Sequence, residues 1–86
     1  METIKVSSKS VPNSVAGAIA SMIREHDKIQ IQVIGAAALN QAMKAMAIAR
    51  GYIITTGKEL VCIPSFHDLI IDEKEITALR LVVELK

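Results

Sequence analysis

Two polar segments carry the side chains best suited to chemistry, and each precedes an expected helix. The candidate ligand-binding residues in these segments are Ser8, Lys9, Ser10, Asn13 and Gly35, and Asn40, Lys44 and Arg50 follow along the second expected helix. Hydrogen-bond donors without nearby carboxylates, together with the positive ends of two helix dipoles, suit the binding of phosphate groups. Gly35 also allows a close approach to the backbone. The alternative is that the serines and Asn13 only cap helices, while the lysines are solvated surface charges.

The residue types needed for catalysis or metal binding are present but scattered. His26, His67 and Cys62 lack the spacing of a metal site. His67 precedes Asp68, but neighbours on a strand point to opposite faces, so the two do not form an acid–base pair. The single cysteine fits a buried strand position and excludes an intramolecular disulfide. We therefore expect no enzyme activity, no metal and no cofactor.

Composition excludes several other classes of protein. The chain has 86 residues, of which 51% are hydrophobic and 22% charged, so it is not intrinsically disordered and fits one domain, residues 1–86. Its net charge of +1 excludes a polycation that binds nucleic acid by charge alone. Only Tyr52 and Phe66 are aromatic, which argues against a stacking platform for single-stranded bases. Since the chain has neither a signal peptide pattern nor an apolar run of roughly 20 residues, we expect no membrane contact and a cytoplasmic location.

The hydrophobic pattern predicts the elements that position the two polar segments. Apolar residues alternate at 3–6, 29–33, 60–71 and 76–85, which indicates strands, and recur with helical spacing at 13–26 and 36–51. The resulting order, β-α-β-α-β-β, predicts an α/β two-layer sandwich: a four-stranded mixed sheet with both helices on one face. Right-handed crossovers would bring the two strand-to-helix loops to the same edge.

Local signals set the expected boundaries of these elements. Ser10 or Asn13 is the expected N-cap of the first helix, with Pro12 in its first turn. Gly51 is the expected stop of the second helix, followed by a short extended piece and a turn at residues 52–57. Pro64 predicts a bulge, a bend or an edge position in the third strand.

The second helix carries two apolar stripes. Leu39, Met43 and Met46 form one stripe, and small residues form the other beside it. The small residues are Ala38, Ala42, Ala45 and Ala49. Because an alanine ridge allows another backbone to approach closely, we expect these four residues to form the interface of a homodimer. The alternative is that both stripes are buried inside one chain.

Charge is unevenly distributed along the sequence. Residues 1–50 contain six Lys or Arg and three Asp or Glu, whereas residues 51–86 contain four and six. The basic half therefore includes both polar segments, and the acidic half ends in the predicted hairpin turn at residues 72–75.

Long ungapped segments of the chain resemble the bacterial stage V sporulation protein S family. These segments are VSSKS (6–10), PNSVAGA (12–18), IQVIG (31–35), LNQAMKA (39–45) and AIARG (47–51). The resemblance extends over nearly the whole chain, including residues 62–64 and 77–78. It implies a small cytoplasmic protein that affects sporulation, chiefly late stages such as coat assembly, with members also in bacteria that form no spores.

The order of elements also resembles, more distantly, the Alba-type nucleic-acid-binding proteins of archaea. That resemblance implies a β-α-β-α-β-β dimer that holds nucleic acid with a lysine in its first loop, the start of its second helix and a basic hairpin arm. Lys9 matches the loop lysine, and Gly35 with Lys44 matches the second motif. The hairpin does not match, because Asp72, Glu73 and Glu75 make it acidic and phosphate repels such an arm.

These observations predict a dimeric regulator that binds DNA or RNA weakly and in a salt-dependent manner. Lys9, Asn13 and the helix start at Gly35 would contact phosphates, assisted by Lys44 and Arg50. The alternative is a protein-interaction module that docks a developmental partner through Asp72, Glu73 and Glu75. A third hypothesis is a sensor of a small anion or nucleotide at the same helix N-termini.

Overall fold

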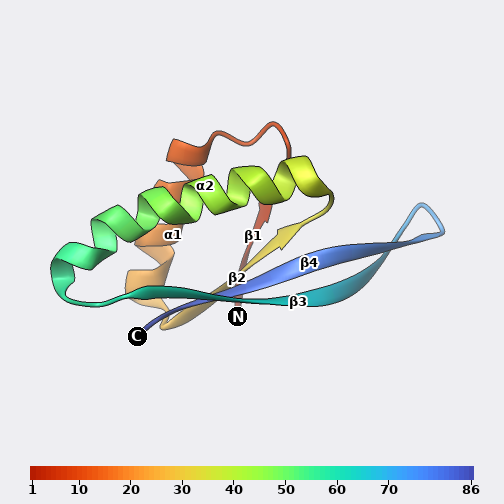
Figure 1. Ribbon diagram of the computed structural model, residues 1–86. Coiled ribbons are helices and arrows are strands. Elements are labelled where there is room, and N and C mark those ends of the chain that lie inside the picture. Colours follow the sequence, from red (N-terminus) through yellow and green to blue (C-terminus); the bar gives the residue numbers. More distant parts are fainter.

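The computed structural model describes residues 1–86 and has the predicted order of elements (Figure 1). They are β1 (Glu2–Val6), α1 (Pro12–Glu25), β2 (Lys28–Val33), α2 (Ala36–Ile53), a 3-10 turn (Ile54–Thr56), β3 (Leu60–Ile71) and β4 (Lys74–Leu85). The strands form one sheet in the order β1-β2-β4-β3. β1 and β2 are parallel, and β4 is antiparallel to both β2 and β3. Both helices cover one face of this mixed sheet, so the predicted two-layer fold is confirmed.

The core lies between that face of the sheet and the two helices. Alternate strand residues such as Ile31 and Leu81, which are register partners, are almost fully buried. Ile19 and Ile23 of α1 lie four residues apart, hence on one face of the helix, and are buried in the same cluster. Strand alternation and helical spacing thus predicted the buried positions correctly.

The start of α1 differs from the expectation. The helix begins at Pro12, which occupies the predicted first turn, but its N-cap is Val11 and no side chain caps it. Ser10 instead accepts a hydrogen bond on Oγ from the Ser7 backbone N–H at 2.9 Å. Asn13 lies inside the first turn and is exposed. The prediction of a Ser10 or Asn13 cap was wrong because the loop uses Ser10 for its own turn.

The end of α2 is also later than predicted. Gly51 lies within the helix, which continues to Ile53 and then tightens into the 3-10 turn. Ile53 is almost fully buried, so packing against the core extends the helix past the glycine. Gly57, at φ +83°, is the residue that ends this helical segment in the left-handed conformation. Residues 52–57 are therefore helical up to that turn and not an extended piece.

The alanine ridge of α2 faces the inside of the chain. Ala38, Ala42, Ala45 and Ala49 are 0–3% exposed and belong to the core cluster, together with Ala16 and Ile19 of α1. Small side chains on both helices let the two helices pack closely. Because these residues are covered within one chain, they do not form a surface for a second copy, and the expected dimer interface was wrong. Of the other stripe, Met46 is buried and Met43 is 41% exposed.

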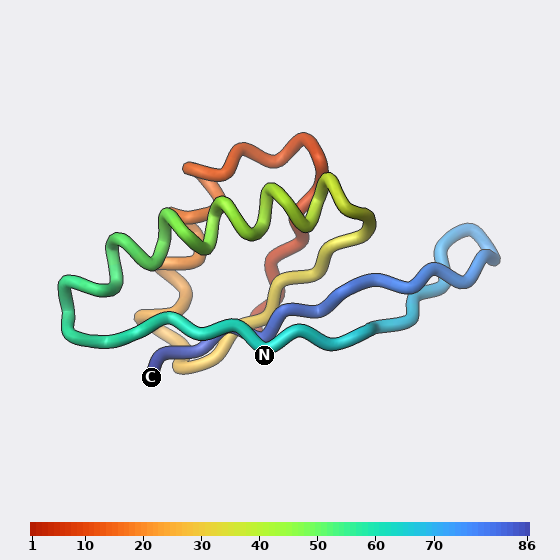
Figure 2. The backbone as a smooth tube through the Cα atoms, viewed as in Figure 1, coloured from red at the N-terminus to blue at the C-terminus, as the bar shows by residue number.

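β3 and β4 form a long hairpin whose distal half, residues 66–77, projects beyond the helices (Figure 2). We call this distal half the hairpin arm. Pairing is continuous from Leu60 with Leu85 to Ile71 with Lys74, so Pro64 causes no bulge. It lies on the outer strand of the sheet, which was one of the three predicted possibilities. Asp72 and Glu73 form a two-residue turn at the tip, with φ values of +51° and +65°.

Candidate nucleic-acid interface

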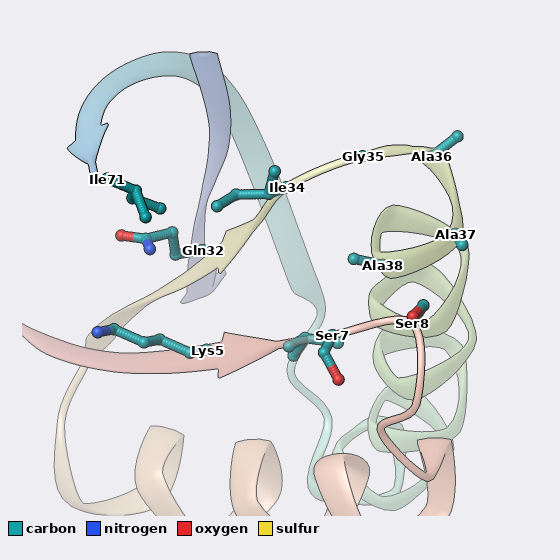
Figure 3. A pocket seen from close by; sticks show the side chains of 11 residues that line it. Lys5, Ser7, Ser8, Gln32, Ile34, Gly35, Ala36, Ala37, Ala38 and Ile71 are labelled. Carbon is teal, nitrogen blue, oxygen red and sulfur yellow. The ribbon is translucent and has the colours of Figure 1, made fainter. Parts of the chain in front are cut away.

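The two strand-to-helix connections meet at one edge of the sheet. β1 and β2 are parallel neighbours, so their carboxyl ends lie side by side and each leads into the start of a helix. A hollow of about 590 Å³ opens between these strand ends, the start of α2 and Ile71 (Figure 3). The predicted meeting of the two loops is therefore confirmed.

The start of α2 leaves its backbone donors free for a ligand. Gly35 is the N-cap residue, with φ +86° and ψ 161°, and no side chain accepts a hydrogen bond from the first turn. The first turn contains no acidic residue. Residues 36–38 are alanines that line the hollow, so no long side chain of this first turn covers its N–H groups. This end of the helix carries the positive pole of its dipole and favours an anion.

The first loop is fixed by its own hydrogen bonds. The Lys9 N–H donates to Ser7 Oγ at 3.2 Å, and the Ser10 N–H donates to the Ser7 carbonyl at 3.1 Å. Gln41 of α2 donates from Nε2 to the Ser10 carbonyl at 2.9 Å, which ties this loop to the second helix. Gln41 is thus a positioning residue that links the two connections, a role that its place in the sequence did not reveal.

The predicted site residues do not all gather at the hollow. Ser8 and Gly35 line it, whereas the other predicted residues lie outside its wall. Lys9 is exposed on the adjoining loop. Asn40 and Lys44 are exposed one and two turns further along α2. The hollow is therefore a backbone and hydroxyl site with lysines at its margin.

Arg50 lies far from this edge. It is 15 residues from Gly35 along α2, about 22 Å at 1.5 Å per residue. Its Nε and terminal nitrogen donate to Glu59 at 2.6 and 2.9 Å. The hydrogen bond and charge of Glu59 raise the pKa of Arg50, and the hydrogen bond from Arg50 lowers the pKa of Glu59. Arg50 therefore does not take part in the hollow, and its pairing with Glu59 joins the end of α2 to the start of β3.

Two residues of the hollow were missed from sequence. Lys5 and Gln32 lie on its sheet side, across from Ser7 and the start of α2 (Figure 3). They are register partners on β1 and β2. Both alternate with apolar residues that face the helices, so the side of the sheet that they occupy was predictable, but their shared edge appears only once the two strands are paired.

An apolar strip runs along the helix-covered side of β3. It starts in a groove of about 200 Å³ between Met43 and Cys62 and continues through Pro64 and Phe66, and Ile70 follows on the same side beyond Asp68. Phe66 and Ile70 are 78% and 76% exposed. Partial burial raises the pKa of the Cys62 thiol, which makes it a poorer nucleophile. The strip thus leaves large apolar side chains exposed on this side of β3.

The structure contains no helix long and apolar enough to cross a membrane. It also contains no group of three or more His, Cys, Asp or Glu side chains arranged to hold a metal ion.

Comparisons with known proteins agree with both resemblances seen in the sequence. The family model described as Stage V sporulation protein S matches residues 2–86. Among solved structures, the chain is similar to Alba from Thermoplasma volcanium, with a TM-score of 0.64 and 16% sequence identity over 99% of each chain. At that identity the likeness shows the shared fold.

Proposed function

Since the chain belongs to the stage V sporulation protein S family, we propose that it is a small dimeric nucleic-acid-binding regulator of sporulation, including late stages such as coat assembly, or of related development. The observation that carries this proposal is the hollow where two strand-to-helix connections meet. It offers backbone and hydroxyl donors, it has lysines at its margin, and the first turn of α2 contains no carboxylate. The Alba-like fold supports the same kind of ligand.

Phosphate groups of the backbone are the proposed ligands at this edge. The free N–H groups after Gly35 and the hydroxyl of Ser8 would donate hydrogen bonds to one phosphate in the hollow, and Lys9 would pair with its charge. Ser10, Asn13, Asn40 and Lys44 would line the path of the neighbouring backbone. These contacts position a nucleic acid without reading its bases. With so few cations in each subunit, binding is expected to be weak and to decrease as salt increases.

A second copy is the proposed occupant of the apolar strip. Only 17 of the 86 residues are buried in one chain, and Met43, Phe66 and Ile70 remain exposed. Burial of these side chains would add to a small core. A dimer would also present two hollows to one nucleic acid and so increase the number of phosphate contacts.

The proposal is tested by titrating the protein into labelled duplex DNA and RNA at two salt concentrations. Wild-type protein is expected to bind more tightly at low salt, and Lys9→Glu is expected to lose binding by charge repulsion. Lys58→Glu is a matched control on a distant exposed loop and should leave binding unchanged. Absence of binding by the folded wild type at low salt, or binding unaltered in Lys9→Glu, would overturn the proposal.

A protein-interaction module is the second candidate function. The hairpin arm projects from the molecule and combines exposed Phe66 with the acidic tip formed by Asp72, Glu73 and Glu75. In that case the acidic tip would dock a developmental partner, and substitutions at residues 72–75 would abolish the interaction. This second function differs from the first in its expected result, because the protein would then show no salt-dependent retention of nucleic acid.

A further inference from the structure

The face of the sheet without helices has its own balance of charge. We call it the open face. Strand alternation and register place four cationic residues on it and one carboxylate, Glu84. The cations are Lys5, Lys28, Lys74 and Arg80. Lys28 Nζ lies 3.6 Å from Glu84 Oε2, so the carboxylate is already neutralised. The open face is therefore positive, although the whole chain has a net charge of only +1.

The acidic residues on the strands of the hairpin arm do not lie on the open face, so they do not neutralise its positive charge. Asp68 and Glu75 occupy positions that alternate with those of the open face, so they point to the helix-covered side. Asp68 Oδ1 accepts a hydrogen bond there from Thr77 Oγ1 at 3.3 Å. Only the two turn residues at the tip bring carboxylates near the far end of the open face.

One rung of polar side chains crosses all four strands of this face. Lys5 of β1 is the register partner of Gln32 of β2. Gln32 is in turn the register partner of Arg80 of β4. Arg80 also pairs with Ser65 of β3. Lys5 and Gln32 also line the hollow, so the rung begins at the proposed phosphate site. Adjacent strands lie about 4.8 Å apart, which puts the backbones at Lys5 and Arg80 about 10 Å apart.

Arg80 has a donor that the protein leaves without an acceptor. Its Nε is the one buried side-chain nitrogen or oxygen in the structure that lacks a hydrogen-bond partner. A buried guanidinium donor without an acceptor is unfavourable, and such groups call for an explanation. The planar guanidinium matches the oxygen atoms of a phosphate, which can accept from two of its N–H groups at once.

We propose that Lys5, Gln32 and Arg80 form a second phosphate contact, so that a bound strand passes from the hollow onto the open face. This inference rests on the proposed function and specifies the path of the nucleic acid. Phosphate oxygens accept hydrogen bonds from the Arg80 guanidinium, which has no protein acceptor on its Nε, and from the Gln32 amide, while the Lys5 ammonium contributes charge. His67, the register partner of Ala78, is the one ring side chain that strand alternation places on this face. Contacts to phosphates position the nucleic acid without reading its bases, so this second contact is independent of sequence.

The test measures how binding to a labelled 20-nucleotide RNA and a 20-base-pair DNA depends on salt. Lys5→Gln and Arg80→Gln each remove one charge and retain a polar side chain. Each is expected to lower the slope of log K against log salt by about 0.7–0.9, the value of one phosphate contact. Arg24→Gln, at the exposed end of α1, is the matched control and should leave the slope unchanged. Lys5 is exposed, so its variant keeps the test valid if Arg80→Gln folds poorly.

The outcomes separate this inference from the proposed function. Loss of binding in Lys9→Glu with slopes unchanged in both Lys5→Gln and Arg80→Gln would overturn the second contact and leave the hollow in place. Absence of binding by the wild type would overturn both. Tight Arg80-dependent binding of polyglutamate, with none of RNA or DNA, would assign the open face to an acidic protein partner instead.

Discussion

At Gly35 the backbone adopts φ +86° and ψ 161°, a region that only glycine occupies readily. Gly35→Ala is expected to reduce the free energy of unfolding by about 1–3 kcal/mol, although no atom lies near the added methyl group. Gly17 in α1 is the matched control, because Gly17→Ala also meets no atom but sits in a helix and should stabilise by about 0.5–1 kcal/mol. Urea denaturation of both variants measures the difference. Equal effects of the two substitutions would contradict the strained start of α2.

The pair formed by Arg50 and Glu59 makes stability depend on pH. The hydrogen bond from Arg50 lowers the pKa of Glu59 in the folded protein. The ionised Glu59 therefore stabilises the fold at pH values above its pKa in the unfolded chain, and this stabilisation is lost as the pH falls through its pKa in the folded protein. Glu59→Gln should therefore lower Tm at pH 7 and have little effect at pH 2. The effect is expected to be small, because both side chains are partly exposed. Glu25→Gln is the control, and a pH-independent difference for Glu59→Gln would contradict the pairing.

Among the elements, α2 owes its position to the alanines that contact the core. Ala45 is fully buried, so Ala45→Leu is expected to overpack the region between the helices and destabilise the chain by about 1–3 kcal/mol. Ala47 is exposed on the same helix, and Ala47→Leu should change stability by less than about 0.5 kcal/mol. Thermal denaturation compares the two variants. If the Ala45→Leu protein were stable but had an altered oligomeric state, the alanine ridge would be an interface between chains, and the expected packing within one chain would be contradicted.

The order, type and buried faces of the elements could be predicted because each depends on local pattern. Alternation at residues 29–33 and helical spacing at 13–26 are properties of short segments. The end of α2 could not be predicted from local pattern, because the burial of Ile53 in the core extends the helix past Gly51. What covers the alanine ridge of α2 could not be predicted either, because it depends on where α1 packs. For the site, Gly35 was recognisable by residue type, whereas Lys5 became part of the hollow only through its pairing with Gln32.

At the scale of the whole molecule, the apolar strip predicts the proposed dimer. The double variant Met43→Ser and Phe66→Ser should lower the mass measured by light scattering from that of two chains to that of one. Ile54→Ser removes a similarly exposed side chain outside the strip and should leave the dimer intact. A wild-type protein that is monomeric at high concentration, or a double variant that remains dimeric, would contradict the use of this surface.

The charges of the whole molecule are segregated in space more than along the sequence. The acidic turn at Asp72 and Glu73 forms the tip of the hairpin arm (Figure 1), and it directly follows Ile71, which lines the hollow. The two carboxylates therefore follow the wall of the hollow in sequence, although neither residue lines it. A nucleic acid held in the hollow would contact lysines and helix N-termini, and the acidic tip would repel phosphates that extend along the arm.

NMR can show whether nucleic acid binds where β1 and β2 lead into the helices. Amide shifts of ¹⁵N-labelled protein would be followed during titration with a short DNA duplex at low salt. The account predicts the largest shifts at Ser8, Lys9 and the amides of residues 35–38, with reversal on addition of salt. Shifts confined to residues 72–75, or no shifts in the folded protein, would contradict it.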